Sequence, residues 1–133
     1  MDINNKESIK VLIVDDQALI RMLIKNILVK AGYNNIYEAE SGRQAIESYN
    51  ENKQDVIIMD IVMADISGKG AIRAIIESNP NANIIVCTSI LDNDFLEDVR
   101  NMGINFFIYK PFNALNLIQK IEMQIELSKT NIY

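Results

Sequence analysis

Three carboxylates, a hydroxyl and an ammonium each follow a short apolar run of this chain, and these are the groups that could do chemistry. They are Asp15, Asp16, Asp60, Thr88 and Lys110. The chain has no histidine, so a Ser-His-Asp or Cys-His nucleophilic site and a His-ligated metal are excluded. The remaining chemistry is that of carboxylates around a hard cation, because Mg²⁺ prefers oxygen ligands.

Each of these residues alone has a simpler explanation. An aspartate after a strand often caps the next helix, and Thr88 or Lys110 alone would be a loop hydroxyl and a solvated charge. The neighbouring Cys87, the only cysteine, is expected to be a small buried core residue. These separate explanations do not account for the five residues together. Three adjacent carboxylates repel one another unless a cation or a lysine neutralises them.

Five short apolar runs rich in β-forming residues are predicted to be strands. The first, third and fourth are nearly continuous in Val, Ile, Leu and Met, which is typical of strands buried on both faces of a parallel sheet. The runs are 9–14, 35–39, 56–59, 83–87 and 105–109.

Apolar residues between these runs recur at helical spacing and predict five helices. Gly32 and Gly103 are expected to stop the first and fourth helices, Ser41 and Gln44 to form a capping box, and Asn113 to cap the fifth helix. The expected buried stripes are Leu19, Leu23, Ile27 and Ala31; Ala45, Ile46 and Tyr49; Ala71, Ile72, Ile75 and Ile76; Phe95, Leu96, Val99 and Met102; and Leu117, Ile118, Ile121 and Ile125.

The alternation predicts an α/β fold, a doubly wound (βα)5 domain with a five-stranded parallel sheet. The expected strand order, 2-1-3-4-5 (flavodoxin-like), is taken from known proteins of this architecture and does not follow from the pattern itself. Ligands bind such sheets beyond the carboxyl ends of the strands, where the five chemical groups would meet. We expect one domain over residues 9–127, with tails at 1–8 and 128–133.

Composition narrows the class of protein. The net charge of −5, from 13 basic and 18 acidic residues, disfavours direct nucleic-acid binding through a broad basic face. No apolar run reaches the roughly 18 residues of a membrane span, residues 1–8 are polar, and one cysteine permits no intrachain disulfide. We therefore expect a cytoplasmic protein that does not bind membranes.

Several motifs together carry a resemblance to a known family. They are V-L-I-V-D-D at 11–16, I-I-M-D-I-V-M at 57–63, Gly68, C-T-S at 87–89 and K-P-F at 110–112. The chain resembles the response-regulator receiver domains over about residues 8–127, and A-G-Y at 31–33 is most similar to stand-alone chemotaxis regulators of the CheY type. Receivers commonly have proline four residues after the phosphoacceptor; this chain has Ala64, which we expect to loosen the loop.

The resemblance implies a role for each chemical group. Asp60 would be the phosphoacceptor, and Asp16, Asp60 and the backbone carbonyl of Val62 would ligate Mg²⁺, with Mn²⁺ a possible substitute. Asp15 would act mainly through a metal-bound water, and Lys110 and Thr88 would donate to phosphoryl oxygens.

The resemblance also implies a switch. Phosphorylation would draw Thr88 inward and let the aromatic Phe107 turn into the space behind it, although Phe107 by itself is equally explained as a core aromatic. The protein would then be a phosphorylation-switched signalling domain and not an enzyme acting on a separate substrate.

Partners follow from the missing histidine. The phosphoryl donor would be a sensor histidine kinase or a small donor such as acetyl phosphate, and the output would be a target such as a flagellar motor switch protein. Val62 and Ile90 flank the path of the hydrolytic water by family analogy, and both are apolar. We therefore expect slow self-dephosphorylation and a separate phosphatase.

Three alternatives remain open from the sequence. The chain could be the receiver of a larger regulator with a DNA-binding or enzymatic output domain. A haloacid-dehalogenase phosphatase also uses a nucleophilic aspartate, but it needs a second one at the position of Val62. In a flavin-binding flavodoxin-like protein the first loop must cradle a phosphate, which Asp15 and Asp16 would repel.

Overall fold

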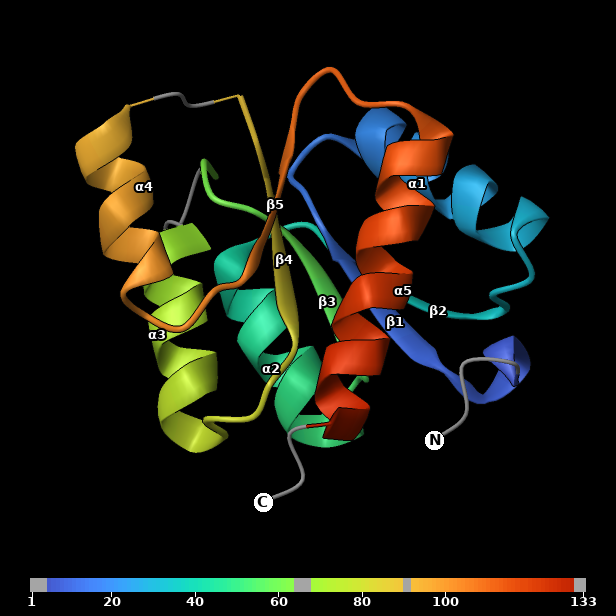
Figure 1. Cartoon of the computed structure of the whole chain (residues 1–133), viewed down its shortest axis with the longest axis horizontal. Helices are drawn as coiled ribbons and strands as arrows, with labels where there is room; N and C mark the ends of the chain where they lie inside the picture. The colour runs from blue at the N-terminus through green and yellow to red at the C-terminus, as the bar shows by residue number, and fades with distance from the viewer. Residues whose placement is uncertain (1–4, 64–67, 90–91, 131–133) are drawn as a thin grey trace.

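The structure, a computed structural model, describes residues 5–63, 68–89 and 92–130, with residue 130 described by its backbone alone. Five strands form one parallel sheet at the centre of the molecule (Figure 1). The strands are β1 Lys10–Val14, β2 Asn35–Ala39, β3 Val56–Asp60, β4 Ile84–Thr88 and β5 Phe106–Tyr109. Each coincides with a predicted run to within about one residue at either end.

The sheet has the order β2-β1-β3-β4-β5, which confirms the expected topology. Val11 to Val14 of β1 pair with Val56 to Met59 of β3, and Asp60 of β3 lies opposite Cys87 of β4. The strand order reverses between β1 and β3, so the loops after these two strands open side by side at one edge.

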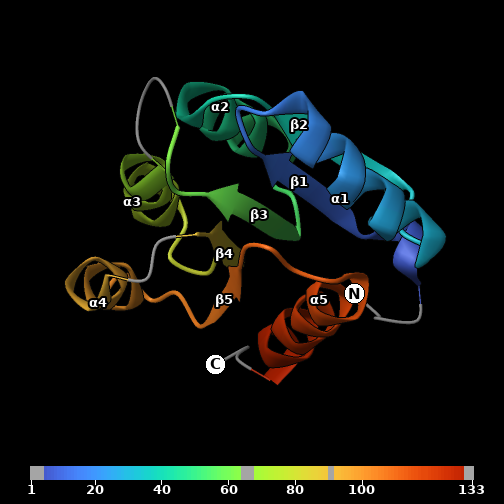
Figure 2. The same cartoon turned by 90° about the horizontal axis from the view of Figure 1, so that it is seen from above.

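Helices cover both faces of the sheet (Figure 2). Helices α1 (Ala18–Lys30) and α5 (Ala114–Thr130) lie on one side. Helices α2 (Gly42–Asn52), α3 (Gly68–Ser78) and α4 (Asn93–Arg100) lie on the other, and a short 3-10 turn, Lys6–Ser8, precedes β1. This arrangement is the doubly wound (βα)5 fold predicted from the alternation of elements.

Alternate strand residues face the two helix layers, as a period of two requires. On the α1–α5 side the buried strand residues are Val11, Ile13, Val56, Ile58, Ile85, Cys87 and Ile108. On the α2–α4 side they are Leu12, Val14, Ala39, Ile57, Met59, Ile84 and Val86. Cys87 is therefore the buried core residue that the sequence predicted.

The predicted buried stripe of α1 is wrong at Leu19 and Leu23, whereas Ile27 and Ala31 are partly buried against the core. Leu19 and Leu23 are 65% and 50% exposed, whereas Ile24 and Leu28 are buried. This helix carries apolar residues around most of its circumference, so several stripes fit the period, and the face that meets the sheet and α5 is decided by tertiary packing. Apart from Gly42, Gly68 and Gln124, the buried residues of α2, α3, α4 and α5 come from the predicted stripes.

The predicted caps are present, but the return bond of the capping box to the Gln44 side chain comes from the amide of Glu40, one residue before Ser41. The Gln44 amide N–H donates to the Ser41 hydroxyl and the Asn116 amide N–H donates to the Asn113 side chain. Gly32 and Gly103 have φ of +102° and +99°, a backbone conformation that favours glycine after a helix. Helix α5 continues through residues 128–130, which we had expected to be tail, and no helix in the described ranges is long and apolar enough to span a membrane.

Candidate functional site

The side chains of the site lie at the carboxyl ends of three strands, and strand alternation aims them to one side. Asp60 is two residues after Ile58 in β3, so its side chain lies on the same face of the sheet as Ile58, the α1–α5 side. Asp15 follows Ile13 of β1 in the same phase, and Lys110 follows Ile108 of β5. The three groups therefore converge although they are far apart in sequence.

Asp60 is the central group, and the residue is only 7% exposed. One oxygen accepts a hydrogen bond from the Val62 amide at 3.1 Å, and the other lies 3.6 Å from the Lys110 ammonium. Burial raises the pKa of Asp60, and the nearby Asp15 and Asp16 raise it further, while the Val62 hydrogen bond and Lys110 lower it in part.

Lys110 connects Asp60 to Asp15. Its ammonium donates to the second oxygen of Asp15 at 2.9 Å and lies beside Asp60. Burial lowers the pKa of Lys110, but the Asp15 hydrogen bond and the charges of Asp60 and Asp15 outweigh that effect and raise it overall. Lys110 is therefore a fixed positive charge at the carboxylates.

The two adjacent acids differ in their surroundings. Asp15 is buried, and its first carboxylate oxygen accepts from the Gln17 amide at 2.9 Å. Asp16 is exposed, and among the residues that the structure describes no hydrogen-bond donor or cationic side chain pairs with its carboxylate. One oxygen from each of Asp15, Asp16 and Asp60 lies within 4.8 Å of the others. Three close carboxylates against one ammonium leave a negative cluster, which fits a divalent cation with oxygen ligands.

Gly68 at the start of α3 lies directly against the end of β3. A Cβ atom built at Gly68 would overlap the Asp60 carbonyl oxygen and the Ile61 Cα atom. No side chain fits in that space, so the glycine of the motif is needed for α3 to approach the backbone of Asp60.

Thr88 and Phe107 lie on the other face of the sheet from Asp60. Thr88 is buried and follows Val86 in the phase that faces the α2–α4 side, and its carbonyl accepts from the Lys110 amide at 2.8 Å. Phe107 lies opposite Val86 in the register and packs against the same cluster. The two predicted switch residues therefore belong to one face of neighbouring strands.

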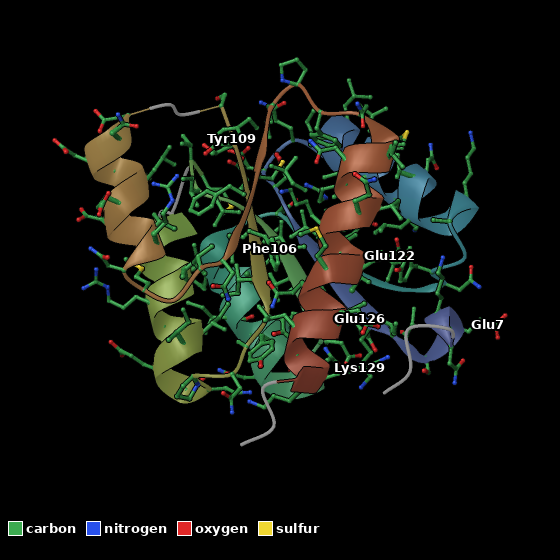
Figure 3. All side chains as sticks on the ribbon, in the orientation of Figure 1. Glu7, Phe106, Tyr109, Glu122, Glu126 and Lys129 are labelled. Carbon is green, nitrogen blue, oxygen red and sulfur yellow. The ribbon has the colours of Figure 1, made fainter. Side chains whose placement is uncertain are left out.

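The outer side of Phe107 is covered by a cation and an aromatic ring. The Arg100 guanidinium of α4 lies 5.0 Å from the centroid of the Phe107 ring, and the Tyr109 ring stacks on it at 6.5 Å. Tyr109 is exposed near the end of β5, which runs between α4 and α5 (Figure 3). Val62 is also exposed, whereas Ala64 and Ile90 lie outside the described residues.

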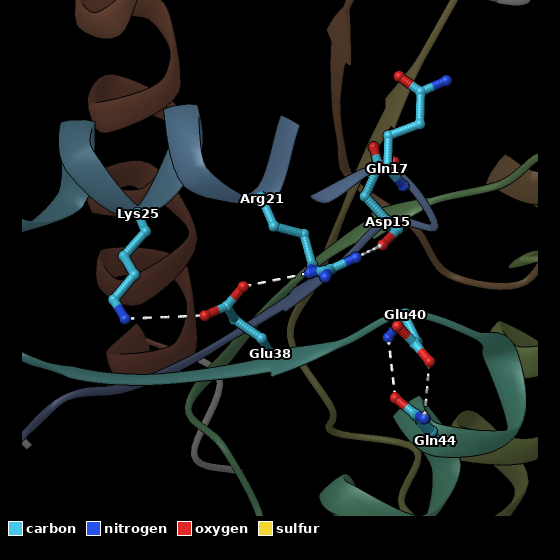
Figure 4. A network of polar contacts seen from close by, with 7 residues as sticks. All are labelled: Asp15, Gln17, Arg21, Lys25, Glu38, Glu40 and Gln44. Atoms are coloured by element: carbon cyan, nitrogen blue, oxygen red, sulfur yellow. Dashed lines mark hydrogen bonds and ion pairs between the residues drawn. The ribbon is translucent and has the colours of Figure 1, made fainter. Parts of the chain in front are cut away.

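Arg21 and Gln17 were missed by the sequence reasoning. The Arg21 guanidinium donates to the Asp15 backbone carbonyl at 2.7 Å and to the Glu38 carboxylate of β2 at 3.1 Å (Figure 4). A signal was present, because Arg21 is the only charged residue in the apolar segment 18–24. Its partners could not be read from the pattern, since they depend on how α1 crosses the sheet.

Comparison with known proteins agrees with this geometry. Residues 11–122 match the family described as the response regulator receiver domain. The chain belongs to this family. That assignment decides against the phosphatase and flavin-binding alternatives, whose site requirements this sequence does not meet.

Relatives of this receiver domain include chemotaxis proteins. CheY of Thermotoga maritima is 41% identical over 112 residues, which are 84% of this chain and 93% of that protein. CheY of Bacillus subtilis is 40% identical with the same coverage of both chains. The transcriptional regulatory protein PdtaR of Mycobacterium tuberculosis is 36% identical over 116 residues, but these are only 56% of its length.

Solved structures show the same fold. The CheX–CheY–BeF3–Mg²⁺ complex of Borrelia burgdorferi gives a TM-score of 0.85 at 25% identity, over 92% of this receiver domain and 93% of the matched chain. A two-component response regulator from Clostridium difficile gives 0.83 at 25% identity, over 93% and 99% of the two chains.

Proposed function

We propose that this receiver domain is the phosphoacceptor of a two-component pathway and that Asp60 takes a phosphoryl group from a sensor histidine kinase. The observation that carries the proposal is the environment of the Asp60 carboxylate. One of its oxygens is held by the Val62 amide and the other faces the Lys110 ammonium, beside two further aspartates.

The transfer requires an ionised Asp60. A carboxylate oxygen of Asp60 attacks the phosphorus of a phosphohistidine, an oxygen–phosphorus bond forms and the phosphorus–nitrogen bond breaks. The electron pair of the broken bond stays on the imidazole of the kinase. Lys110 and the Thr88 hydroxyl donate to oxygens of the transferred group, and this chain supplies no leaving group or other covalent partner.

Mg²⁺ is the cofactor that the acidic cluster fits, with Mn²⁺ as a substitute. Asp16, Asp60 and the Val62 carbonyl would hold it, and Asp15 would contribute through a water molecule. When bound, the cation offsets the negative charge that gathers where a carboxylate meets a phosphoryl group. Asp16 suits a ligand role because it is the exposed member of the cluster and has no competing partner among the described residues.

The output surface is the face formed by α4, β5 and α5. Thr88 and Phe107 share one side of neighbouring strands, so a movement of Thr88 toward a new phosphoryl group changes the space available to Phe107. Phe107 has no hydroxyl, so its ring is held by packing alone, with Arg100 and Tyr109 lying against it. Phosphorylation thereby changes which partners this face binds.

Chemotaxis signalling is the role that the relatives favour. Two CheY proteins match over 93% of their own length, and we infer a cytoplasmic regulator whose target is a component such as a flagellar motor switch protein. The match to PdtaR supports the alternative, a receiver from a larger regulator. The proposed domain spans residues 9–127, and its last helix, α5, extends to Thr130. The related CheY of Borrelia forms a complex with CheX, and a separate phosphatase is a further partner that we propose here.

The test is phosphorylation by acetyl phosphate with and without Mg²⁺. Wild type should gain an acid-labile, hydroxylamine-sensitive phosphoryl group only when Mg²⁺ is present, and Asp60→Asn should gain none while keeping the native fold. Equal labelling of Asp60→Asn and wild type would overturn the assignment of Asp60. Labelling of wild type in the presence of a chelator would overturn the cation dependence.

A further inference from the structure

Arg21 of α1 joins the edge strand β2 to the acidic site (Figure 4). Its guanidinium donates through Nη1 to the Asp15 carbonyl at 2.7 Å and through Nε to the Glu38 carboxylate at 3.1 Å. The other oxygen of Glu38 lies 3.7 Å from the Lys25 ammonium. The Arg21 side chain is only 14% exposed, so it is held inside this network and is not a mobile surface charge.

The Asp15 carbonyl needs a donor from outside the sheet. Pairing of β1 with β2 and with β3 ends at Val14, and the Asp15 amide already donates to the Ala39 carbonyl. Asp15 is buried, so an unpaired carbonyl here would cost free energy. With Arg21 on the carbonyl, Gln17 and Lys110 on the carboxylate and Ala39 on the amide, all the polar atoms of Asp15 are bonded.

The same carbonyl belongs to the peptide that joins Asp15 to Asp16. A peptide is planar, so a bond that fixes its carbonyl also fixes the direction of the Asp16 backbone. The Asp16 carboxylate has no partner of its own among the described residues, so only the backbone fixes the direction in which this side chain leaves the chain. We propose that Arg21 is a positioning residue for the cation site, which orients Asp16 by holding the Asp15–Asp16 peptide.

This inference rests on the proposed cation site. The direction in which Mg²⁺ affinity changes when Arg21 is replaced distinguishes a positioning role from an effect of its charge. A guanidinium near a cation site repels the cation, so loss of its charge alone would tighten Mg²⁺ binding. Loss of a group that orients metal ligands weakens binding, commonly by about tenfold or more. Glu38 offsets the Arg21 charge across a contact of 3.1 Å, so the positioning effect should dominate.

The experiment is a calorimetric Mg²⁺ titration of the whole chain and its variants. We expect Arg21→Ala and Arg21→Lys to bind Mg²⁺ on the order of tenfold more weakly than wild type, because lysine keeps the charge but lacks the planar guanidinium fork that spans the Asp15 carbonyl and the Glu38 carboxylate. Lys25→Ala is the matched control: it removes one positive charge from the same helix and from the same Glu38, but it makes no contact with Asp15. Its affinity should stay within about twofold of wild type.

A second measurement needs no cation. The carbonyl carbon of Asp15 and the amide of Asp16 should shift in NMR spectra of cation-free Arg21→Lys and remain near their wild-type positions in Lys25→Ala. Thermal unfolding of every variant shows that the titrations report on folded protein, and Arg21→Lys decides the matter if Arg21→Ala does not fold.

The outcomes separate this inference from the proposed function. Unchanged or tighter Mg²⁺ binding by Arg21→Lys, or an equal loss in Lys25→Ala, would overturn the role of Arg21. Asp16→Ala in the same titration tests the site itself. If wild type binds no Mg²⁺, or if Asp16→Ala binds it as wild type does, then the proposed cation site is wrong. If Asp16→Ala loses Mg²⁺ binding while both Arg21 variants keep wild-type affinity, then the cation site stands and only the positioning role of Arg21 is rejected.

Discussion

Asp60 carries a charge that its surroundings disfavour. The residue is almost fully buried, and burial together with the two neighbouring aspartates raises the pKa of its carboxyl. The ionised form that can attack phosphorus is therefore maintained at a cost to the stability of the fold. The Val62 amide and Lys110 reduce that cost without removing it.

The first prediction is that Asp60→Asn stabilises the cation-free protein at neutral pH. A carboxyl whose pKa is higher in the folded state than in the unfolded state binds its proton more tightly when folded, so ionisation destabilises the fold. This destabilisation is complete above the folded-state pKa and disappears as the pH falls toward the unfolded value. The melting temperature of Asp60→Asn should exceed that of wild type by roughly 3 °C for each kcal/mol of stabilisation.

Thermal unfolding as a function of pH checks this sign. The gap between Asp60→Asn and wild type should be largest at neutral pH and should narrow as the pH falls through the folded-state pKa of Asp60. Glu47→Gln, which changes an exposed carboxylate on α2, is the control and should leave the melting temperature nearly unchanged. An Asp60→Asn protein that is less stable than wild type at neutral pH would contradict the account.

At the scale of elements, the start of α3 lies against the end of β3. Gly68 has the backbone of Asp60 and Ile61 within the space that a side chain would occupy. Helix α3 therefore supports the strand end that presents Asp60, and the contact is one of backbone against backbone.

Gly68→Ala should destabilise the protein by about 2 kcal/mol, because the added methyl group must displace the Asp60–Ile61 backbone or move α3. Urea unfolding measures the loss. Arg73→Ala, at an exposed position of the same helix, is the control and should change stability by less than about 0.5 kcal/mol. Equal stabilities of Gly68→Ala and wild type would show that the close approach is absent in solution.

Val62, in the loop after β3, is expected to affect how long a phosphoryl group persists on Asp60. Val62 is exposed next to Asp60 and is apolar, so its side chain cannot orient an attacking water by hydrogen bonding. We expect Val62→Asn to lose its phosphoryl group roughly three- to tenfold faster than wild type, since water positioning accelerates hydrolysis. A decay time course measures this, with Val62→Ile as the apolar control; identical decay of Val62→Asn and wild type would refute the argument.

Helices differ in how well the sequence predicts their buried face. Periodicity located all five helices, and in α2 to α5 the apolar stripe and the buried stripe coincide. In α1 it failed, because Leu19, Met22, Leu23 and Val29 are apolar yet exposed. A helix that is apolar on several sides leaves its rotation to be set by packing, here with Ile24 and Leu28 facing inward.

At the scale of the whole molecule, the site results from the topology. Parallel strands place all their carboxyl ends at one edge, and the order β2-β1-β3-β4-β5 brings the ends of β1 and β3 together. The acids and Lys110 could be predicted because each directly follows a strand whose position the apolar pattern reveals. Arg21 could not, because its two contacts depend on how a helix crosses two strands.

The central claim is that Asp60 accepts the phosphoryl group, and one measurement tests it without any mutation. Wild-type protein is incubated with acetyl phosphate and Mg²⁺ and then reduced with borohydride, which converts an aspartyl phosphate to homoserine. Tandem mass spectrometry of the peptides then locates the homoserine. The account predicts homoserine at position 60 alone, and only when Mg²⁺ was present; homoserine at position 15 or 16 instead, or none at position 60, would contradict it.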